Sequence, residues 1–277
     1  MKNWTILEII KWTTDYFAEK QVEKPRLNAE YIISHVLQCK RFDLYVRFEE
    51  IVSPENRETI KKLLLERAAH KPLQYVLGET EFYGYKLFVN PAVLIPRPET
   101  EYLVEKIIAE IGSAESVLDI GTGSGAISIS LKKELPQLQV SALDVSADAL
   151  VTAKRNAEYN GVEIAFYQSD IFSNCTKRYD LIVSNPPYIP QHEYAGLSKE
   201  ILQHEPPSAL LAEENGLYFY RKILTEASNH LNKNGRIYLE IGYNQSAAIK
   251  KIAENMGFSE IETVKDLNNF DRIMRIK

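Results

Sequence analysis

A glycine-rich stretch near the middle of the chain has residue types and spacing suited to a nucleotide-like ligand. Residues 117–125 read VLDIGTGSG, so an apolar run leads into three glycines. Glycine lets the backbone turn sharply and lets a ligand approach it closely, and a helix that follows points its N-terminal amides at that ligand. The residues predicted to contact the ligand here are Gly121, Thr122, Gly123, Ser124 and Gly125.

Asp119 helps to identify this ligand, because it stands just before the first glycine. The pattern Gly121-x-Gly123-x-x-Ala126 also fits the loop that holds the pyrophosphate of a dinucleotide. A carboxylate at this place would repel a pyrophosphate, but it attracts a ligand that carries an ammonium and a sulfonium group. The residues therefore favour S-adenosylmethionine over a nicotinamide cofactor, with Asp119 as a further cofactor-binding residue.

Two more acidic residues stand at the ends of the next predicted strands. Asp144 is placed where a carboxylate can accept both hydroxyl hydrogens of an adenosine ribose. Asp170 and Ile171 end the third strand, in position to bind the adenine amino group and to contact its ring. Any one of the acids could merely cap the helix that follows it. Three of them at successive strand ends favour a cofactor site.

A fourth strand ends in Asn185-Pro186-Pro187-Tyr188, a turn suited to a planar amino group. The prolines remove two backbone donors, so the carbonyls of this turn can face a ligand without competing internal bonds. Asn185 adds a side-chain carbonyl acceptor, and Tyr188 adds a flat face for stacking. The turn can therefore accept both hydrogens of an NH2 group. A purely structural turn is the alternative, and the glycine loop upstream makes it the less favoured one.

The elements that must position these residues fall into three regions. Residues 1–74 are predicted to form a small helical bundle, with a capping box at Thr5 and Glu8, a second helix capped by Asn28 and a third after Pro54. No titratable cluster or glycine-rich loop interrupts this region. It is therefore interpreted as a packing or docking module.

Residues 75–98 are predicted to form a β-hairpin that links the two larger regions. Short extended runs at 75–77, 81–83 and 86–89 are separated by glycines, and Pro96-Arg97-Pro98 forces an extended exit.

Residues 99–277 alternate predicted strands and helices. Repeated βα units imply a mostly parallel sheet with helices on both faces, and ligands bind beyond the carboxyl ends of such strands. Strands are expected over 116–120, 139–143, 163–168, 179–184, 236–241, 261–264 and 272–276, and helices after the glycine loop and over 147–160, 216–231 and 245–256.

Composition excludes several classes of protein. Apolar residues make up 45% of the chain and charged residues 26%, so a proper core can form and disorder is excluded. The two cysteines stand in unrelated contexts, which argues against a disulfide framework and a zinc site. Residues 99–277 hold 18 Lys and Arg against 25 Asp and Glu, an unfavourable balance for binding a nucleic-acid duplex. No metal is expected. No run is apolar enough to span a membrane, so a cytoplasmic protein is expected.

The glycine loop and the Asn-Pro-Pro-Tyr turn together resemble those of amino-group methyltransferases, which include adenine-N6 DNA enzymes and protein glutamine-N5 enzymes. Further motifs are similar to those of the peptide chain release factor glutamine methyltransferases, the HemK/PrmC family, over essentially the whole chain. They are Gln74-Tyr-x-x-Gly78, Glu81-Phe-Tyr-Gly84, Leu94-Ile-Pro-Arg-Pro-Glu-Thr-Glu101, His204-Glu205-Pro206, Ala209-Leu210 and Gly216-Leu217-x-x-Tyr220.

This resemblance implies a Rossmann-like class I S-adenosylmethionine-dependent methyltransferase domain over 99–277, preceded by a helical substrate-docking domain and the hairpin linker. It implies that residues 121–125 and Asp144 hold the cofactor and that Asn185 stands where the methyl group is transferred. Members often carry an aromatic residue at the place of Ile171, so here an apolar contact replaces ring stacking.

The implied substrate is the glutamine side chain in the Gly-Gly-Gln motif of bacterial class 1 release factors, held by the turn 185–188. An amide nitrogen is a poor nucleophile, so the site must mainly orient and polarise it. If the Asn185 side-chain oxygen and the Pro186 carbonyl accept the two amide hydrogens, the nitrogen is held in line for transfer. Asn185 and Pro186 are thus the predicted catalytic residues. The segment that contains His204-Glu205-Pro206 is expected to wall the substrate, with an ordinary loop as the alternative.

Two other functions remain open. An adenine-N6 nucleic-acid methyltransferase would present the same planar NH2 group, flipped out of its stack, to the same turn. The acidic catalytic half and the lack of a basic recognition domain oppose it, and no direct nucleic-acid binding is expected. A binding module that keeps the cofactor fold without catalysis is the weaker choice, because Asp119, Asp144 and Asn185 are all present.

Overall fold

The computed structural model describes residues 3–277, and their packing divides the chain into two units. The first unit comprises the chain up to Gly78 together with Lys199–His204, and the second comprises Glu79–Ser198 and Glu205–Lys277. The glycine loop and the Asn-Pro-Pro-Tyr turn both belong to the second unit. The assignment of residues 199–204 to the first unit was not anticipated from the sequence.

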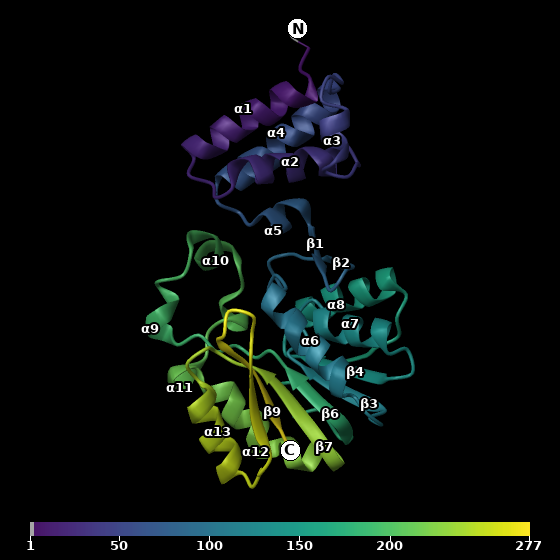
Figure 1. Ribbon diagram of the computed structural model, residues 1–277, viewed down its shortest axis with the longest axis vertical. Coiled ribbons are helices and arrows are strands. Elements are labelled where there is room, and N and C mark those ends of the chain that lie inside the picture. Colours follow the sequence, from purple (N-terminus) through teal and green to yellow (C-terminus); the bar gives the residue numbers. More distant parts are fainter. Residues whose placement is uncertain (1–2) are drawn as a thin grey trace. The chain divides into compact units, whose positions relative to one another are not determined.

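The first unit consists of helices around an apolar core that includes Phe17, Ile32 and Ile33. The expected capping box is present: the Thr5 hydroxyl accepts from the Glu8 amide at 3.3 Å, and the Glu8 carboxylate accepts from the Thr5 amide at 3.0 Å. The helices are α1 (Ile6–Glu19), α2 (Pro25–Val36), α3 (Asp43–Val46), α4 (Pro54–Ala68), α5 (Leu73–Leu77) and α10 (Lys199–His204) (Figure 1).

Asn28 does not cap the second helix, because α2 begins earlier, at Pro25. Proline suits a first helical turn, where its missing amide hydrogen has no partner to lose. Asn28 lies inside the helix, and its Nδ2 donates to backbone carbonyls just before the helix at 2.9 and 3.2 Å. Its Oδ1 accepts from Nε of the buried Arg67 at 2.6 Å, and Arg67 also pairs with Glu200 of α10. Arg67 therefore joins α10 to the other helices of this unit.

The hairpin is shorter than the linker predicted from the sequence. Its strands β1 (Glu79–Phe82) and β2 (Tyr85–Phe88) pair antiparallel through a turn at Tyr83 and Gly84, both with positive φ. Such two-residue turns match the twist of the strands they join. Residues 75–77 were expected to be extended, but they lie in α5, which ends at Gly78 with a φ of 74°. A left-handed glycine is a common helix end, and here it separates α5 from the hairpin.

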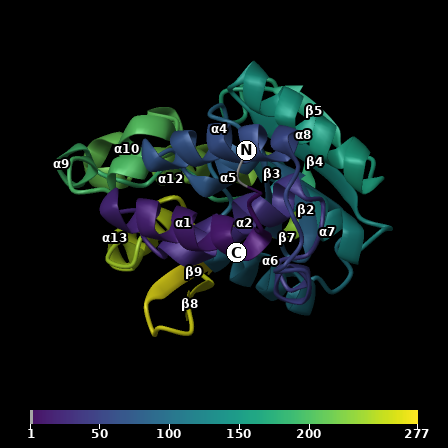
Figure 2. The ribbon, with the colours of Figure 1, turned by 90° about the horizontal axis from the view of Figure 1, so that it is seen from above.

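Besides the hairpin, the described residues of the second unit form a seven-stranded sheet with the order β5-β4-β3-β6-β7-β9-β8. Neighbouring strands from β5 to β7 are parallel, whereas β9 is antiparallel to both β7 and β8. Figure 2 shows β5 and β8 at opposite edges. The strands are β3 (Ser116–Ile120), β4 (Gln139–Asp144), β5 (Ala165–Gln168), β6 (Tyr179–Ser184), β7 (Leu231–Glu240), β8 (Ile261–Lys265) and β9 (Asp271–Ile276).

Helices cover both faces of this sheet, as expected for an α/β fold (Figure 1). Successive residues of β6 point to opposite faces: Leu181 and Val183 belong to one apolar cluster and Ile182 to the other. Strands buried on both faces read as continuous apolar runs, which is why the sequence predicted them well. One face carries α6 (Pro98–Glu110), α7 (Ala126–Glu134) and α8 (Ala147–Asn160), and the other carries α12 (Tyr218–His230) and α13 (Ser246–Asn255).

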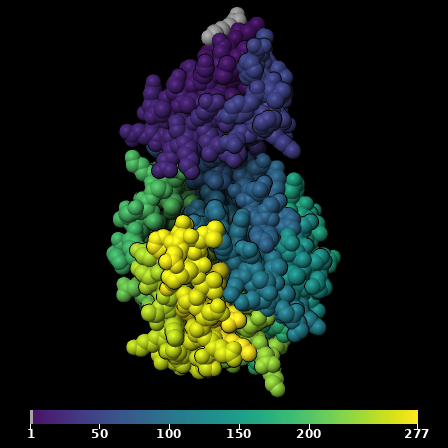
Figure 3. All heavy atoms as spheres, in the orientation of Figure 1, coloured from purple at the N-terminus to yellow at the C-terminus, as the bar shows by residue number. Residues whose placement is uncertain are grey.

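Short helical segments connect β6 to α12. They are α9 (Gln191–Tyr194), α10, the 3-10 helix η1 (Pro207–Ala209) and α11 (Glu213–Gly216). The C-terminal residues, yellow in Figure 3, lie on the surface of the second unit. None of the described helices combines the length and the apolar composition that a bilayer crossing requires.

Candidate active site

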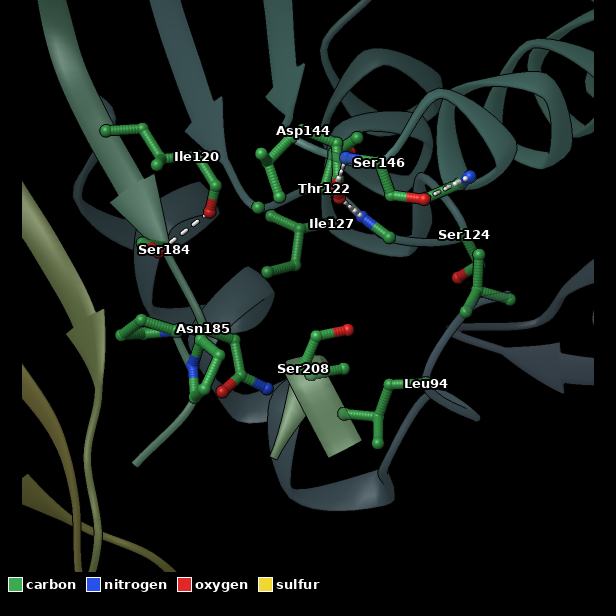
Figure 4. A pocket seen from close by; sticks show the side chains of 18 of the residues that line it. Leu94, Ile120, Thr122, Ser124, Ile127, Asp144, Ser146, Ser184, Asn185 and Ser208 are labelled. Carbon is green, nitrogen blue, oxygen red and sulfur yellow. Dashed lines mark hydrogen bonds between the residues drawn. The ribbon is translucent and has the colours of Figure 1, made fainter. Parts of the chain in front are cut away.

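A pocket lies beyond the carboxyl ends of the parallel strands in the second unit (Figure 4). Its walls come from the glycine loop, the ends of β3, β4 and β6, the stretch before α6, and residues of η1 and α12. Asp119, Gly125 and Tyr188 are not part of this lining. The predicted site residues that line the pocket are Gly121, Thr122, Gly123, Ser124, Asp144, Asp170, Ile171, Asn185, Pro186 and Pro187.

The glycine loop leaves open space beside its backbone. Gly121 and Gly123 have φ of 72° and 55°, and a Cβ built on either would meet no other protein atom within 4 Å. Gly125 is different, because its Cβ would come within 3.0 Å of the Ile129 side chain. The first two glycines therefore keep the pocket side of the loop bare for a ligand, and the third permits close packing of α7.

Asp119 lies beneath this loop and is fully buried. Its Oδ2 accepts from the hydroxyl groups of Thr122 at 2.7 Å and Ser128 at 2.6 Å, while its Oδ1 has no hydrogen-bond partner among the described residues. Burial raises the pKa of this carboxyl to about 6. Because Asp119 does not line the pocket, it can act on a cationic ligand there through its negative charge and not by direct contact.

Asp144 ends β4 and faces the pocket (Figure 4). The amide of Gly123 donates to its Oδ2 and the amide of Ser146 to its Oδ1, both at 2.9 Å. Burial raises the pKa of Asp144, and the two backbone donors oppose that rise. Each carboxylate oxygen keeps capacity for another donor, so a pair of ribose hydroxyl groups could be bound here.

Asp170 and Ile171 follow β5 rather than end it. Asp170 is exposed at the rim and forms an ion pair with Lys222 at 3.1 Å, whereas Ile171 is buried. Ile171 has a φ of 50°, an unusual conformation for a β-branched residue. Both residues line the pocket, and their contact with an adenine stays a prediction.

The turn after β6 brings Asn185 to the pocket beside the strand ends (Figure 4). The preceding Ser184 is anchored, because its hydroxyl donates to the Ile120 carbonyl of β3 at 2.7 Å. Nδ2 of Asn185 donates to the Thr100 hydroxyl at 3.1 Å, and its Oδ1 has no bond within residues 3–277. Asn185 thus offers a free side-chain acceptor at the pocket, and its role in methyl transfer stays a prediction.

Tyr188 does not line this pocket. Its ring packs against the apolar cluster that includes residues of α12, and burial raises the pKa of its hydroxyl to about 12. Its carbonyl accepts from Gln245 Nε2 at 3.0 Å, and a Cβ at Gly216 would come within 2.2 Å of the same oxygen. The stacking role expected of Tyr188 stays a prediction, whereas its place in the fold is that of an anchor for the turn.

Several pocket residues were not identified from the sequence. Leu94 and Thr100 belong to a family motif but were given no role of their own, and Ser208 was not singled out, although the side chains of Leu94 and Ser208 border the pocket (Figure 4). Arg97 also lines it and is held by Glu205, whose two oxygens lie 2.8 and 2.9 Å from Arg97 Nη2. Leu94 and Arg97 could have been noticed by their position, because they lie between the hairpin and α6, where Pro96 and Pro98 hold the chain extended.

The segment expected to wall the substrate is divided between the units. His204 ends α10 in the first unit, while Ser208 and Ala209 contribute to the pocket. Its predicted role as a wall or lid stays a prediction. No group of three or more His, Cys, Asp or Glu side chains among residues 3–277 is arranged to hold a metal ion.

Solved structures with a similar fold are methyltransferases. One from Pyrococcus furiosus has a TM-score of 0.55 and 23% identity, covering 80% of this chain and 98% of its own. A 16S rRNA methyltransferase of T. thermophilus, RsmC, solved with AdoMet and guanosine, has a TM-score of 0.53 and 17% identity, covering 72% of this chain and 49% of its own. At these identities the likeness concerns the fold, and it confirms the Rossmann-like methyltransferase architecture.

Two family models and many curated relatives match the sequence. The Methyltransferase small domain matches residues 98–210, and the PrmC N-terminal domain matches residues 8–78. A release factor glutamine methyltransferase of Geobacter sulfurreducens is 40% identical, covering 98% of this chain and 96% of that protein. One of Chlorobaculum tepidum is 39% identical with the same coverage. Relatives this similar over nearly the whole chain, together with both domain models, show that it belongs to the release factor glutamine methyltransferase family.

Proposed function

We propose that this protein transfers a methyl group from S-adenosylmethionine to the N5 amide nitrogen of the glutamine in the Gly-Gly-Gln motif of bacterial class 1 release factors. One observation carries the proposal: the free Oδ1 of Asn185 and the carboxylate of Asp144 face the same pocket. An acceptor for an amide and an acceptor for a ribose therefore share one cavity. The family supports a glutamine of a release factor as the substrate.

The residues present fit the cofactor. Asp144 would hold the ribose, the bare backbone at Gly121 and Gly123 would pass beside the methionine part, and Asp170 with Ile171 would contact the adenine. The unpartnered Oδ1 of Asp119 would favour a cation above it. Bound in this way, S-adenosylmethionine supplies an electrophilic methyl group on a sulfonium.

The work left to the protein is to orient a weak nucleophile. The Asn185 Oδ1 and the Pro186 carbonyl would accept the two hydrogens of the substrate amide, which holds its nitrogen in one direction and raises its electron density. Once methylated, the nitrogen is acidic and releases a proton to water, so no strong base is required. His192 is largely exposed and is not part of the pocket lining.

The first unit would bind the body of the release factor. None of its described residues lines the methyl-transfer pocket, and the PrmC N-terminal domain model matches residues 8–78. The two glycines of the substrate motif would let an extended backbone enter a narrow site. The proposed place of action is the cytoplasm, with no direct contact to nucleic acid.

The test is mass spectrometry of a purified class 1 release factor after incubation with this protein and S-adenosylmethionine. A single added methyl group on the glutamine of Gly-Gly-Gln is expected, and Asn185→Ala should reduce its rate of appearance. If isotope-labelled methyl groups appeared on DNA or RNA and none on the release factor, the substrate assignment would be wrong, but the proposed chemistry of the site would still hold. No transfer to any of them would refute the proposed activity.

A further inference from the structure

The proposed reaction requires that Asn185 present its oxygen, and not its nitrogen, to the substrate. The two ends of an Asn amide have nearly the same shape, so packing alone distinguishes them poorly. With the nitrogen toward the substrate, two sets of amide hydrogens would face each other. Something must therefore fix which end of the amide faces the pocket.

Thr100 and Glu240 form a buried pair that does so. The Thr100 hydroxyl donates to Glu240 Oε2 at 2.6 Å and accepts from Asn185 Nδ2 at 3.1 Å. Thr100 is 4% exposed and Glu240 1% exposed. A hydroxyl carries a single hydrogen and a carboxylate can only accept. Because the Thr100 hydroxyl donates its hydrogen to Glu240, its oxygen can only accept a hydrogen bond from Asn185. The Asn185 Nδ2 must therefore face Thr100, and the Asn185 Oδ1 faces the pocket.

The sheet holds the members of this chain of bonds in place. Ser184 of β6 is aligned with Leu239 of β7, so the next residues, Asn185 and Glu240, stand at the same level of neighbouring strands. Thr100 lies in the first turn of α6, which packs over these strands. Glu240 ends β7, Thr100 lies in α6 and Asn185 directly follows β6, so each member of the chain of bonds lies in a regular element or next to the end of one.

We infer that Thr100 and Glu240 are positioning residues for the proposed methyl transfer, acting through the orientation of the Asn185 amide. This inference rests on the proposed function. Neither residue need touch the substrate nitrogen. A buried carboxylate is costly to a fold, and burial raises the pKa of Glu240 to about 7 although Arg272 and Arg97 oppose that rise. An orienting role accounts for a carboxylate buried at this place.

The experiment compares variants of the full-length protein by steady-state methylation of a release factor. Thr100→Val removes the hydroxyl while keeping the shape, and it should lower kcat about tenfold, as for one lost hydrogen bond. Thr100→Ser restores the hydroxyl and should recover most of kcat. The dissociation constant for S-adenosylmethionine should stay within about twofold in both.

Thr152 of α8 provides a matched control. It is also 4% exposed and also accepts from an Asn side chain, Asn90 Nδ2 at 3.0 Å, but it is not part of the pocket lining. Thr152→Val should leave kcat unchanged. In an Asn185→Ala background, Thr100→Val should cause no further loss, since the group that it orients is absent. A wild-type kcat for Thr100→Val, or an undiminished loss in that background, would overturn the inference.

A spectroscopic measurement separates this inference from the substrate assignment. In nitrogen-15 NMR spectra, the signal of the Asn185 side-chain amide can be identified because it is absent in Asn185→Ala. The hydrogens of this amide should exchange slowly with water in the wild type. Thr100→Val should remove this protection and Thr152→Val should not. If the wild type failed to methylate release factors, the substrate would be wrong, but these spectra would still decide the orientation. Unchanged exchange in Thr100→Val would refute the inference without touching the proposed activity.

Discussion

Two Asn–Thr pairs in the second unit differ in where the threonine hydroxyl sends its hydrogen. Asn185–Thr100 and Asn90–Thr152 have similar bond lengths, 3.1 and 3.0 Å, and equally buried threonines. The Thr152 hydroxyl donates at 3.2 Å to the Asp148 carbonyl of its own helix, whereas that of Thr100 in α6 donates to the buried Glu240 carboxylate of strand β7.

The difference teaches how one local motif can serve two purposes. A backbone carbonyl four residues earlier is available in any helix, so Thr152 needs no partner of its own to secure the loop at Asn90. A buried carboxylate must be provided specifically and is costly. We therefore assign the first pair to local folding and the second to the reaction, and the predictions below test that assignment.

The largest expected effect contrasts the two asparagines. Asn185→Ala should lower kcat by about 10²-fold or more, as for loss of a transition-state hydrogen bond, while S-adenosylmethionine binding survives. Asn90→Ala should leave kcat within about twofold. Single-turnover methylation of a release factor and isothermal titration with the cofactor would measure both. Equal kcat losses in the two variants would abolish the distinction.

The next effect concerns stability. Burial raises the pKa of Glu240 from 4.5 to about 7, so ionising it destabilises the folded state. This destabilisation is absent below about pH 4.5, grows as the pH rises through 7, and is complete above it. Glu240→Gln removes it, and after the weakened Thr100 bond is subtracted the variant should be about 2 kcal/mol more stable than the wild type at pH 8. Urea unfolding at pH 8 and pH 5 should show this advantage only at the higher pH.

The same titration should appear in the rate. When Glu240 is protonated it can donate to Thr100, whose hydroxyl is then free to turn toward Asn185 and release the amide. With saturating cofactor, kcat of the wild type should therefore fall about fivefold as the pH drops from 8 to 6, because the protonated form keeps the roughly tenfold lower rate expected without an oriented amide. Glu240→Gln should be slower at pH 8 and nearly independent of pH. The other charged or titratable groups that act on Glu240 are Arg97, Glu99, Tyr188, Tyr220 and Arg272.

The pH dependence of kcat can be compared with that of KM, because burial raises the pKa of Asp119 to about 6, close to that of Glu240. Protonation of Asp119 would weaken cofactor binding and would appear in KM rather than in kcat at saturation. A pH dependence of kcat that survived in Glu240→Gln would assign the titration elsewhere.

The smallest effect completes the comparison. Thr152→Val should lower the free energy of unfolding by about 1 kcal/mol, the net value of a buried hydrogen bond, and leave kcat within about twofold. Chemical denaturation and the methylation assay on one preparation would test both. A variant that kept its stability but lost activity would show that the Asn90 loop shapes the pocket more than its bonding suggests.

Sequence reasoning worked best for buried strands. The bounds of 116–120 and 179–184 agree with β3 and β6, because uninterrupted apolar runs ending at Gly or Asn-Pro have few other interpretations. It was wrong for residues 75–77, where the helix depends on Pro72 and Gly78 at its two ends. It was wrong again for Asn28, whose side chain is used inside the helix.

The site was predictable only where a motif is local. The family, the fold and the cofactor were predicted correctly from the glycine loop, the Asn-Pro-Pro-Tyr turn and the linker motifs. Thr100 and Glu240 could not be found in this way, because the bonds that join Asn185 to Thr100 and Thr100 to Glu240 span 85 and 140 residues. Such contacts can be identified only once the order of strands β6 and β7 and the position of α6 are known.

The assignment of Lys199–His204 to the first unit has a practical consequence. The chain passes between the units three times, after Gly78, after Ser198 and after His204. A truncation at one point of the chain therefore cannot remove the whole helical unit. Removing its N-terminal residues would deprive α10 of Arg67, and would leave Glu200 without the cation that it pairs with. Lost activity in a truncated protein would then report a misplaced internal segment as readily as lost docking, and point substitutions on the outer faces of α1 and α4 would separate the two causes.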